Sequence, residues 1–396
     1  MLYLYRPSTF ASFTFITPVP LTTRVHPREA AVVTTKQIHI DPGWTFRDEA
    51  GNTLEPQLFS LLQAIFEHKK LTLAAKAAGI SYRHAWNLLQ KWSGFFGTDL
   101  VTMSRGRGAE LTLLGEKLLW AEQRVMARFQ PQMANIASEL NLEIHKAMAG
   151  VSPVLRIQAS HGYAVALLPK ALSEIQLDLQ YSSPVEALSA LNRGSCDIAG
   201  FHLPTQVSIP AVNEHYQRLL KPRAHKIIRF ISRQQGLMIK ADNPCGIHGL
   251  NDLVPKENSE MQPAAVWPRF INRQEDSGTR ALFDQLLLDQ GLSHEAINGY
   301  NNREYTHSAV AAYVAAGMAD VGFGVEEAAH KFGLQFIPLC REDYLFVCHQ
   351  KKLKQAVVEN FVTALSAPSF KKNIEQLAGY SAHDCGQIVD VATVLD

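Results

Sequence analysis

Small polar residues recur where apolar stretches of the sequence end, and their types suit the binding of an anion. Residues 277–280, Ser-Gly-Thr-Arg, place two hydroxyls, a bare glycine backbone and a guanidinium at the start of a helical pattern. A helix N-terminus with such donors is a ready anion site. The full set of candidate ligand-binding residues is Ser160, His161, Ser182, Ser183, His202, Ser277, Gly278, Thr279, Arg280 and Thr306.

Other chemistries fit these residues less well. A single serine or threonine in such a place often does no more than cap a helix. His161, His202 and His307 could form a metal site, but their spacing has no ligand signature, so we expect no metal. The sequence contains no nucleophile elbow, phosphate loop, dinucleotide fingerprint or HExxH motif, so we expect no catalytic residues and a protein that is not an enzyme.

A second group of residues has the chemistry of DNA contact. Between Lys69 and Arg107 there are seven lysines and arginines and one acidic residue, Asp99, although the whole chain has a net charge of only +1. A local cationic surface is typical of a duplex-binding module, although it could also be the solvated face of a helical bundle. The candidate DNA-binding residues are Ser81, Tyr82, Arg83, His84, Asn87, Lys91, Arg105 and Arg107.

These residues lie where two helical patterns meet. The alanine-rich residues 71–78 are followed by Gly79, which can adopt the left-handed conformation, and by Ser81, which can cap the next helix. An apolar stripe at helical spacing runs along that second helix and consists of Ala85, Leu88, Leu89 and Trp92. The pattern predicts a helix-turn-helix whose second helix turns its donor-rich face to solvent.

Segments on either side complete this module. Residues 58–66 repeat the apolar stripe on a supporting helix, and residues 100–112 read as a hairpin with a basic tip at 104–108, which is a wing. Residues 37–40 are expected to form a strand that could pair with this hairpin. We expect residues 1–35, which are rich in serine, threonine and proline, to be a disordered extension.

A long helix is expected after the wing, with Thr112 as its cap. Its apolar residues, spaced mostly by four, are Leu114, Leu118, Val125, Phe129, Met133, Ile136, Leu140 and Ile144. Pro131 is expected to kink or break it. Such a seam favours a linker and dimerisation helix, with packing on its own domain as the alternative. A dimer would present two recognition helices to a palindromic site.

From residue 154 onwards strands alternate with helices. Strands are predicted at residues 154–159, 177–181, 197–201, 227–233, 237–239, 269–272, 321–323 and 345–348, and helices at 163–172, 184–192, 279–289 and 308–316. This alternation predicts βαβ units and a parallel sheet. Small molecules bind beyond the carboxyl ends of such strands, where the candidate anion-binding residues stand.

Residues 55–120 resemble the winged helix-turn-helix of ModE-type and LysR-type transcription regulators. The resemblance is carried by residues 74–81, AAKAAGIS, which depart from the pattern only in having Ala78 where it has leucine. Residues 81–86, SYRHAW, and the wing that ends in LTLLG at 111–115 are similar to the ModE branch. The resemblance implies DNA binding.

Residues 154 to about 365 resemble a type II periplasmic-binding-protein domain. The motifs are ASHGY at 159–163, CDIAGFH at 196–202 and NRQEDSGTR at 272–280. They are similar to the binding-protein-like domains fused to ModE-type heads and to some molybdopterin-biosynthesis proteins. The resemblance implies a two-lobed ligand domain and, as effector, molybdate or tungstate first and formate or another small carboxylate second.

Together these observations predict a multidomain fold of α plus α/β class. The expected parts are the extension at 1–35, a winged helix-turn-helix at 36–115, a linker and dimerisation helix at 116–150, and a sensor domain at 151–396. Within the sensor, lobe I is expected at about 154–225 and 341–396 and lobe II at about 226–340. With 396 residues the chain is long enough for several cores.

The predicted function is a transcription regulator that senses a small anion and controls molybdenum-related genes. We expect a homodimer, or a tetramer, bound to palindromic double-stranded DNA, with no cofactor other than the anion. Five scattered cysteines and the lack of an apolar run of about 18 residues favour the cytoplasm and exclude a membrane partner. The alternatives are a ligand-independent repressor or architectural DNA-binding protein, and a molybdopterin-related cofactor-handling protein.

Overall fold

The computed structural model describes residues 57–104, 108–149, 153–255 and 267–395, together with 38–40, 43, 46–47, 49, 51 and 53–54. The predicted extension at 1–35 lies outside the described residues, as do the wing-tip residues Arg105 and Arg107. In this described part no helix combines the length and the apolar character needed to cross a membrane.

Three short helices and a hairpin form the N-terminal module. They are α1 (Leu58–His68), α2 (Leu71–Ala77), α3 (Tyr82–Phe96), β3 (Val101–Ser104) and β4 (Gly108–Leu111). Gly79 between α2 and α3 has φ +70°, the left-handed conformation, and the Ser81 hydroxyl accepts a hydrogen bond from the His84 amide. The predicted stripe of α3 is buried. The predicted helices, turn, cap and hairpin are therefore present.

The predicted strand at residues 37–40 is wrong for the part that the structure describes. Residues 38–40 form no strand; the backbone of Ile38 instead pairs with the side-chain amide of Asn141, with distances of 2.7 and 2.9 Å. The Asn141 side chain thus satisfies the backbone groups of Ile38 that a neighbouring strand would otherwise bind. The first strand pair along the described chain is formed by β1 (Phe46–Arg47) and β2 (Thr53–Leu54), which are antiparallel.

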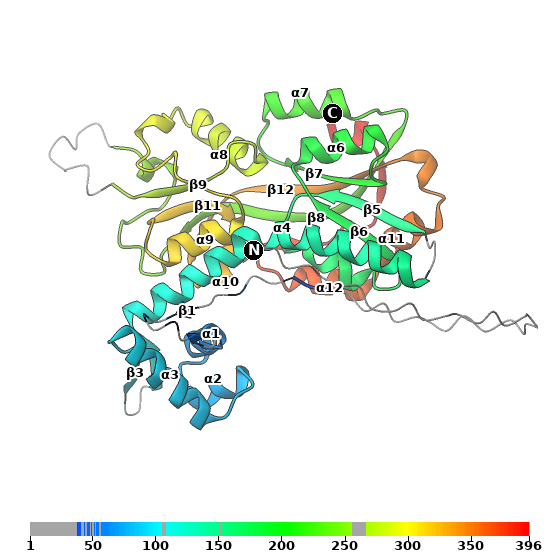
Figure 1. Ribbon diagram of the computed structural model, residues 1–396. Coiled ribbons are helices and arrows are strands. Elements are labelled where there is room, and N and C mark those ends of the chain that lie inside the picture. Colours follow the sequence, from blue (N-terminus) through cyan, green and yellow to red (C-terminus); the bar gives the residue numbers. More distant parts are fainter. Residues whose placement is uncertain are drawn as a thin grey trace, which may run out of the picture. The chain divides into compact units, whose positions relative to one another are not determined.

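Helix α4 (Leu113–Ala149) is the longest element of the described chain, and Thr112 caps it as expected, because the Gly115 amide donates to its hydroxyl. Of the predicted kink or break at Pro131, the break is wrong, because the helix continues through the proline; Figure 1 shows a change of direction near the middle of α4. Proline removes one hydrogen bond from a helix, which permits a bend without ending it.

The α/β part is built on one large sheet with the strand order β10-β9-β11-β8-β12-β7-β5-β6. Its strands are β5 (Val154–Ala159), β6 (Gln176–Tyr181), β7 (Ile198–Pro204), β8 (His225–Ile239), β9 (Phe270–Arg273), β10 (Arg303–Glu304), β11 (Val321–Val325), β12 (Gln335–His349), β13 (Tyr380–Ser381) and β14 (Ile388–Asp390). Pairs such as β5 with β6 are parallel, but β8 and β12 run antiparallel to their neighbours. The predicted parallel sheet is thus a mixed one.

Strands β8 and β12 run through both lobes of this sheet. In the first lobe the end of β12 pairs with β7 and the start of β8 pairs with β14. In the second lobe the end of β8 pairs with β11. The first lobe has its own apolar cores around β5, β6 and β7, and the second has cores around β9 and β11. The lobes are therefore joined by continuous sheet.

Helices cover both faces of the sheet, with α8 on one side and α9 and α10 on the other (Figure 1). The helices of the α/β part are η1 (Val165–Leu167), α5 (Leu168–Ala171), α6 (Pro184–Arg193), α7 (Pro210–Leu219), η2 (Leu250–Leu253), α8 (Gly278–Asp289), η4 (His294–Ala296), α9 (His307–Ala315), α10 (Glu326–Lys331), η5 (Gln350–Lys352), α11 (Ala356–Ser366), α12 (Pro368–Glu375) and α13 (Ala392–Leu395). Helix α4 packs along α9 and β6.

Candidate anion-binding site

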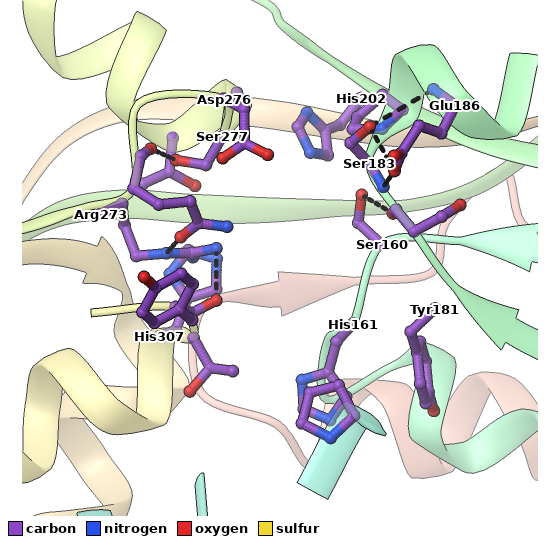
Figure 2. Close-up of a pocket in the computed structure, with 18 of the residues that line it drawn as sticks. Ser160, His161, Tyr181, Ser183, Glu186, His202, Arg273, Asp276, Ser277 and His307 are labelled. Carbon is purple, nitrogen blue, oxygen red and sulfur yellow. Dashed lines mark hydrogen bonds between the residues drawn. The ribbon is translucent and has the colours of Figure 1, made fainter. Parts of the chain in front are cut away.

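A cavity of about 470 Å³ lies between the two lobes. Figure 2 shows its two walls facing each other, one with Arg273, Ser277 and His307 from the second lobe, the other with Ser160 and His202 from the first. Helix α4 contributes a further wall with Arg128, Phe129, Pro131 and Gln132. A concave site at the meeting point of two lobes is the usual place for a small ligand.

Three helix N-termini meet at this cavity. Helix α6 begins there at Ser183 and Pro184, α8 at Ser277, and α9 at Thr306. Each of these hydroxyl side chains accepts a hydrogen bond from an amide in the first turn of its own helix. A helix N-terminus carries about half a positive charge, so each of the three adds positive potential to a space that Glu186 and Asp276 also line.

Arg233, which lines the cavity, belongs to a buried ion pair. The guanidinium of Arg233 on β8 donates to the Glu342 carboxylate on β12 at 2.7 and 2.8 Å, and both side chains are almost fully buried. Gln235 donates to the same carboxylate at 2.7 Å, and Nδ1 of His202 lies 3.2 Å from it. Burial is the largest influence and works against ionisation of Glu342, but Arg233, His202 and Gln235 together outweigh it and lower the carboxyl pKa.

Arg273 has the opposite arrangement, because no carboxylate of the described chain lies within ion-pair distance of it. Its guanidinium donates to the Gln274 side chain at 3.1 Å and to the Tyr305 carbonyl at 3.0 Å, both neutral acceptors. Burial and the nearby charge of Arg233 lower its pKa to about 10, which leaves it charged at neutral pH. A charged guanidinium at a cavity wall that forms no ion pair is suited to an anionic ligand.

The histidines of the cavity are neutral at pH 7. Burial, reinforced by the charge of Arg273, lowers the pKa of His161 to about 4, and burial lowers the pKa of His202 and His307 as well. Within the described chain Nδ1 of His307 and Oγ of Ser182 have no hydrogen-bond partner. These groups can therefore offer neutral hydrogen bonds to a ligand.

His202 also brings the lobes into contact. A Cβ atom placed on Gly278 would lie 2.3 Å from the imidazole Cε1, so only glycine allows this approach at the start of α8. The contact joins β7 of the first lobe to α8 of the second.

Nine of the ten predicted ligand-binding residues line this cavity, and Arg280 does not. Its guanidinium donates to the Asp284 carboxylate at 3.0 Å and lies 4.0 Å from the ring centre of Tyr300. A side chain in the first turn of a helix readily pairs with an acid four residues later, and this spacing was visible in the sequence. Arg280 is therefore left out of the candidate site.

Three arginines of the cavity, Arg128, Arg233 and Arg273, were not among the predicted ligand-binding residues. Arg273 stands within the motif at 272–280, so its charge next to the predicted helix N-terminus was an available signal. Arg233 gave none, because its partner Glu342 lies 109 residues away and only the pairing of β8 with β12 brings them together. Arg128 belongs to the linker helix, which had no expected role in ligand binding.

The candidate DNA-binding residues that the structure describes lie on one exposed surface of α3. Tyr82, Arg83, His84, Asn87 and Lys91 are all exposed, and Ser81 caps the helix. Nε2 of His84 is 3.0 Å from the Gln57 side chain, which holds this ring against α1. The hairpin strands beside α3 lead towards the wing tip, whose arginines lie outside the described residues.

Within the described chain, no group of three or more histidine, cysteine, aspartate and glutamate side chains is arranged to hold a metal ion. His161, His202 and His307 share the cavity, but the charges of Arg233 and Arg273 beside them oppose a cation there.

Comparisons with known proteins agree with this two-lobed arrangement. The family model described as PBP superfamily domain matches residues 165–366. YvgK of Bacillus subtilis (strain 168), described as uncharacterized, is 30% identical over 224 residues, which cover 56% of this chain and 68% of that protein. The molybdenum-pterin-binding protein MopB of Rhodobacter capsulatus is 28% identical over 132 residues, 32% of this chain and 48% of MopB.

Two full-length solved structures also match. BenM is 15% identical, with a TM-score of 0.37 and coverage of 82% of this chain and 97% of that one. CbnR, a LysR family transcriptional regulator, is 14% identical, with a TM-score of 0.35 and coverage of 78% of this chain and 99% of that one.

Proposed function

The chain belongs to the PBP superfamily, and from this premise we propose that it is a transcription regulator whose two-lobed domain senses an anion. The observation that carries the proposal is the cavity into which three helix N-termini and the unpaired guanidinium of Arg273 converge. Together they supply positive potential and directed donors without a metal ion. An anion that contacts both walls would favour a closed state, and only such differential affinity can shift the population of two states.

Molybdate or tungstate is the first ligand class that we propose, and formate or another small carboxylate is the second. The relation to a molybdenum-pterin-binding protein supports the first. The volume of about 470 Å³ supports a third class, an organic anion, because it lies within the range of pockets that hold small organic ligands. A cofactor-handling protein for a phosphorylated pterin would fit that third class.

Isothermal titration of the full chain with molybdate, tungstate, sulfate, formate and a phosphorylated pterin tests this proposal. We expect one class to bind and to raise the melting temperature, since a ligand at 100 times its dissociation constant adds about 2.7 kcal/mol of stability. If the pterin alone binds, the cofactor-handling function is the better one. If none binds, a ligand-independent repressor or architectural DNA-binding protein replaces the sensor.

The output of the regulator is proposed to be binding of palindromic DNA by a homodimer. The exposed donor-rich surface of α3 supports the DNA contact, and exposed apolar side chains along α4, at Ile136, Leu140 and Ile144, support the dimer. Two recognition helices related by a twofold axis would then reach successive major grooves. Sedimentation that finds only monomers at concentrations that bind DNA would contradict the dimer.

Replacing Arg83 by alanine is expected to weaken binding to the specific operator by about 10- to 100-fold and to relax sequence preference. The reason is that an arginine which reads a base edge contributes about 1 to 3 kcal/mol of discrimination. Fluorescence anisotropy with operator and random duplexes measures both effects. An equal loss on the two duplexes would show that Arg83 contacts only phosphate. Lys76→Ala, on α2, is the comparison for a general loss of charge.

A further inference from the structure

The linker helix α4 is tied to both lobes, and it changes partner at Pro131. Before the proline its contacts are with the second lobe: Lys117 donates to the Ala316 carbonyl, Arg124 pairs with the buried Glu304, and the Ala127 carbonyl accepts from Thr306. After the proline its hydrogen bonds to the α/β part are with β6 of the first lobe, and Asn141 further along pairs with the backbone of Ile38.

After the proline, two side chains of α4 each form two hydrogen bonds with β6. The side-chain amide of Asn135 donates to the Tyr181 carbonyl at 3.0 Å and accepts from the Tyr181 amide at 2.6 Å, like a residue of an added strand. The hydroxyl of Ser138 accepts from the Leu179 amide and donates to Asp178, both at 3.1 Å. The second half of α4 therefore has to move with β6.

Pro131 is the point at which α4 bends most easily. It has no amide hydrogen, so the Ala127 carbonyl lacks its normal partner four residues later. The hydroxyl of Thr306 supplies the missing hydrogen bond at 3.0 Å and at the same time caps α9. The bend is thus stabilised by a residue of the cavity wall itself, and Arg128, Phe129, Pro131 and Gln132 line the same cavity.

The first half of α4 is also held to the helix-turn-helix. The Thr112 hydroxyl donates to the Asp99 carbonyl at 2.7 Å, and the Thr112 amide donates to the Leu100 carbonyl at 2.9 Å. A Cβ atom on Gly115 would lie 2.2 Å from the Leu100 carbonyl oxygen, so the first turn of α4 packs directly on the base of the wing. Rotation of this half-helix would carry the module with it.

We propose that α4 is a hinge that bends at Pro131 when the two lobes close and so transmits the closure to the helix-turn-helix. When an anion draws the lobes together, each half of α4 follows its own lobe, the angle at Pro131 changes, and the two recognition helices of the dimer change their separation. This inference rests on the proposed function, because it requires an anion in the cavity and DNA at the helix-turn-helix. It adds the route by which the one affects the other.

The test compares the full-length wild type with Pro131→Ala, which restores the missing amide donor and stiffens the helix. Operator affinity is measured with and without saturating molybdate, with tungstate and formate as further probes, and titration calorimetry on the same samples reports whether the probe binds. In the wild type we expect the anion to change operator affinity by about 5- to 150-fold, the usual range of allosteric coupling. In Pro131→Ala we expect that ratio to fall to within about twofold of one.

Gln130→Ala is the matched control, because Gln130 is exposed, precedes the hinge and does not line the cavity. It should retain the wild-type ratio. A second readout uses spin labels at Glu116→Cys and Glu143→Cys in a Cys245→Ser background, about 40 Å apart along a straight helix. In dimers with one labelled chain, molybdate should change this distance in the wild type and leave it unchanged in Pro131→Ala.

The outcomes separate this inference from the function on which it rests. A probe that binds and alters operator affinity equally in the wild type and Pro131→Ala, with an unchanged label distance, overturns the hinge and leaves the sensor intact. A probe that binds without affecting operator affinity overturns the coupling of cavity and DNA. Absence of binding by every probe overturns the proposed function and the hinge with it.

Discussion

Replacing Arg273 by methionine is expected to weaken anion binding by about 10- to 100-fold. The substitution keeps much of the side-chain volume and removes a charge of the cavity wall that forms no ion pair within the described chain. A hydrogen bond to a charged group contributes about 1.5 to 3 kcal/mol, and each 1.4 kcal/mol is a factor of ten in affinity. Isothermal titration of the full chain with the anion that binds the wild type gives the affinities.

Two further variants define what Arg273 contributes. Arg273→Lys keeps the charge without the planar fork, so it should recover part of the affinity. Arg303→Gln removes an arginine of the same lobe that is exposed, lies outside the cavity and pairs with the exposed Glu275 at 3.0 Å, so it should bind like the wild type. If Arg273→Met and Arg303→Gln bind equally well, the anion is not held at this wall.

Replacing Glu342 by glutamine is expected to lower the free energy of unfolding by about 3 to 5 kcal/mol. The shape of the side chain is preserved, but the guanidinium of Arg233 is left buried without its counter-charge, which is the costly way to break a buried ion pair. Urea unfolding followed by tryptophan fluorescence measures the change. The same variant should bind an anion more tightly than the wild type, because the Arg233 guanidinium is then no longer neutralised by Glu342 and can also attract the anion.

The pH dependence of this effect follows from the lowered pKa of Glu342. A carboxyl whose folded pKa is below its ordinary value of 4.5 stabilises the protein above that pH, and the stabilisation is lost as the pH falls through the folded pKa. The difference between the wild type and Glu342→Gln should therefore shrink in acid. Glu275→Gln, in an exposed pair, should cost less than about 1 kcal/mol at any pH.

A double substitution checks the physical reason. With both charges removed, in Arg233→Met with Glu342→Leu, most of the lost stability should return, since an apolar pair of similar volume often replaces a buried ion pair without cost. A loss that is as large in the double variant as in Glu342→Gln would mean that the packing of β8 against β12, and not the unpaired charge, was disturbed.

Local patterns in the sequence predicted much of the fold. The stripe of α3, its Ser81 cap and the bounds of β5 depend on neighbouring residues, and all are present. The long strand β8 was predicted in two pieces, because Gly236 interrupts its apolar pattern, and of β12 only residues 345–348 were predicted. A Cβ atom on Gly236 would lie 2.0 Å from the Ile337 carbonyl oxygen, so the interruption is itself required by close strand pairing.

The cavity was predictable where it depends on helix starts and not where it depends on distant partners. The hydroxyl residues at three helix N-termini could be predicted from their residue type and from their position before a helical pattern. The ion pair of Arg233 with Glu342 and the wall supplied by α4 follow from tertiary contacts across 109 and about 180 residues, which no local pattern encodes.

Because β8 and β12 run through both lobes, the first lobe cannot be completed until the second has been synthesised. Strand β8 ends at residue 239, but β12, its longest partner, ends only at residue 349. At ordinary rates of translation the ribosome needs roughly 5 to 20 s for that interval. Over this time the nascent first lobe, although it is made first, has an unpaired apolar strand. Completion of the first lobe must therefore wait for the second, and until then the edge of β8 is open to pairing with other chains.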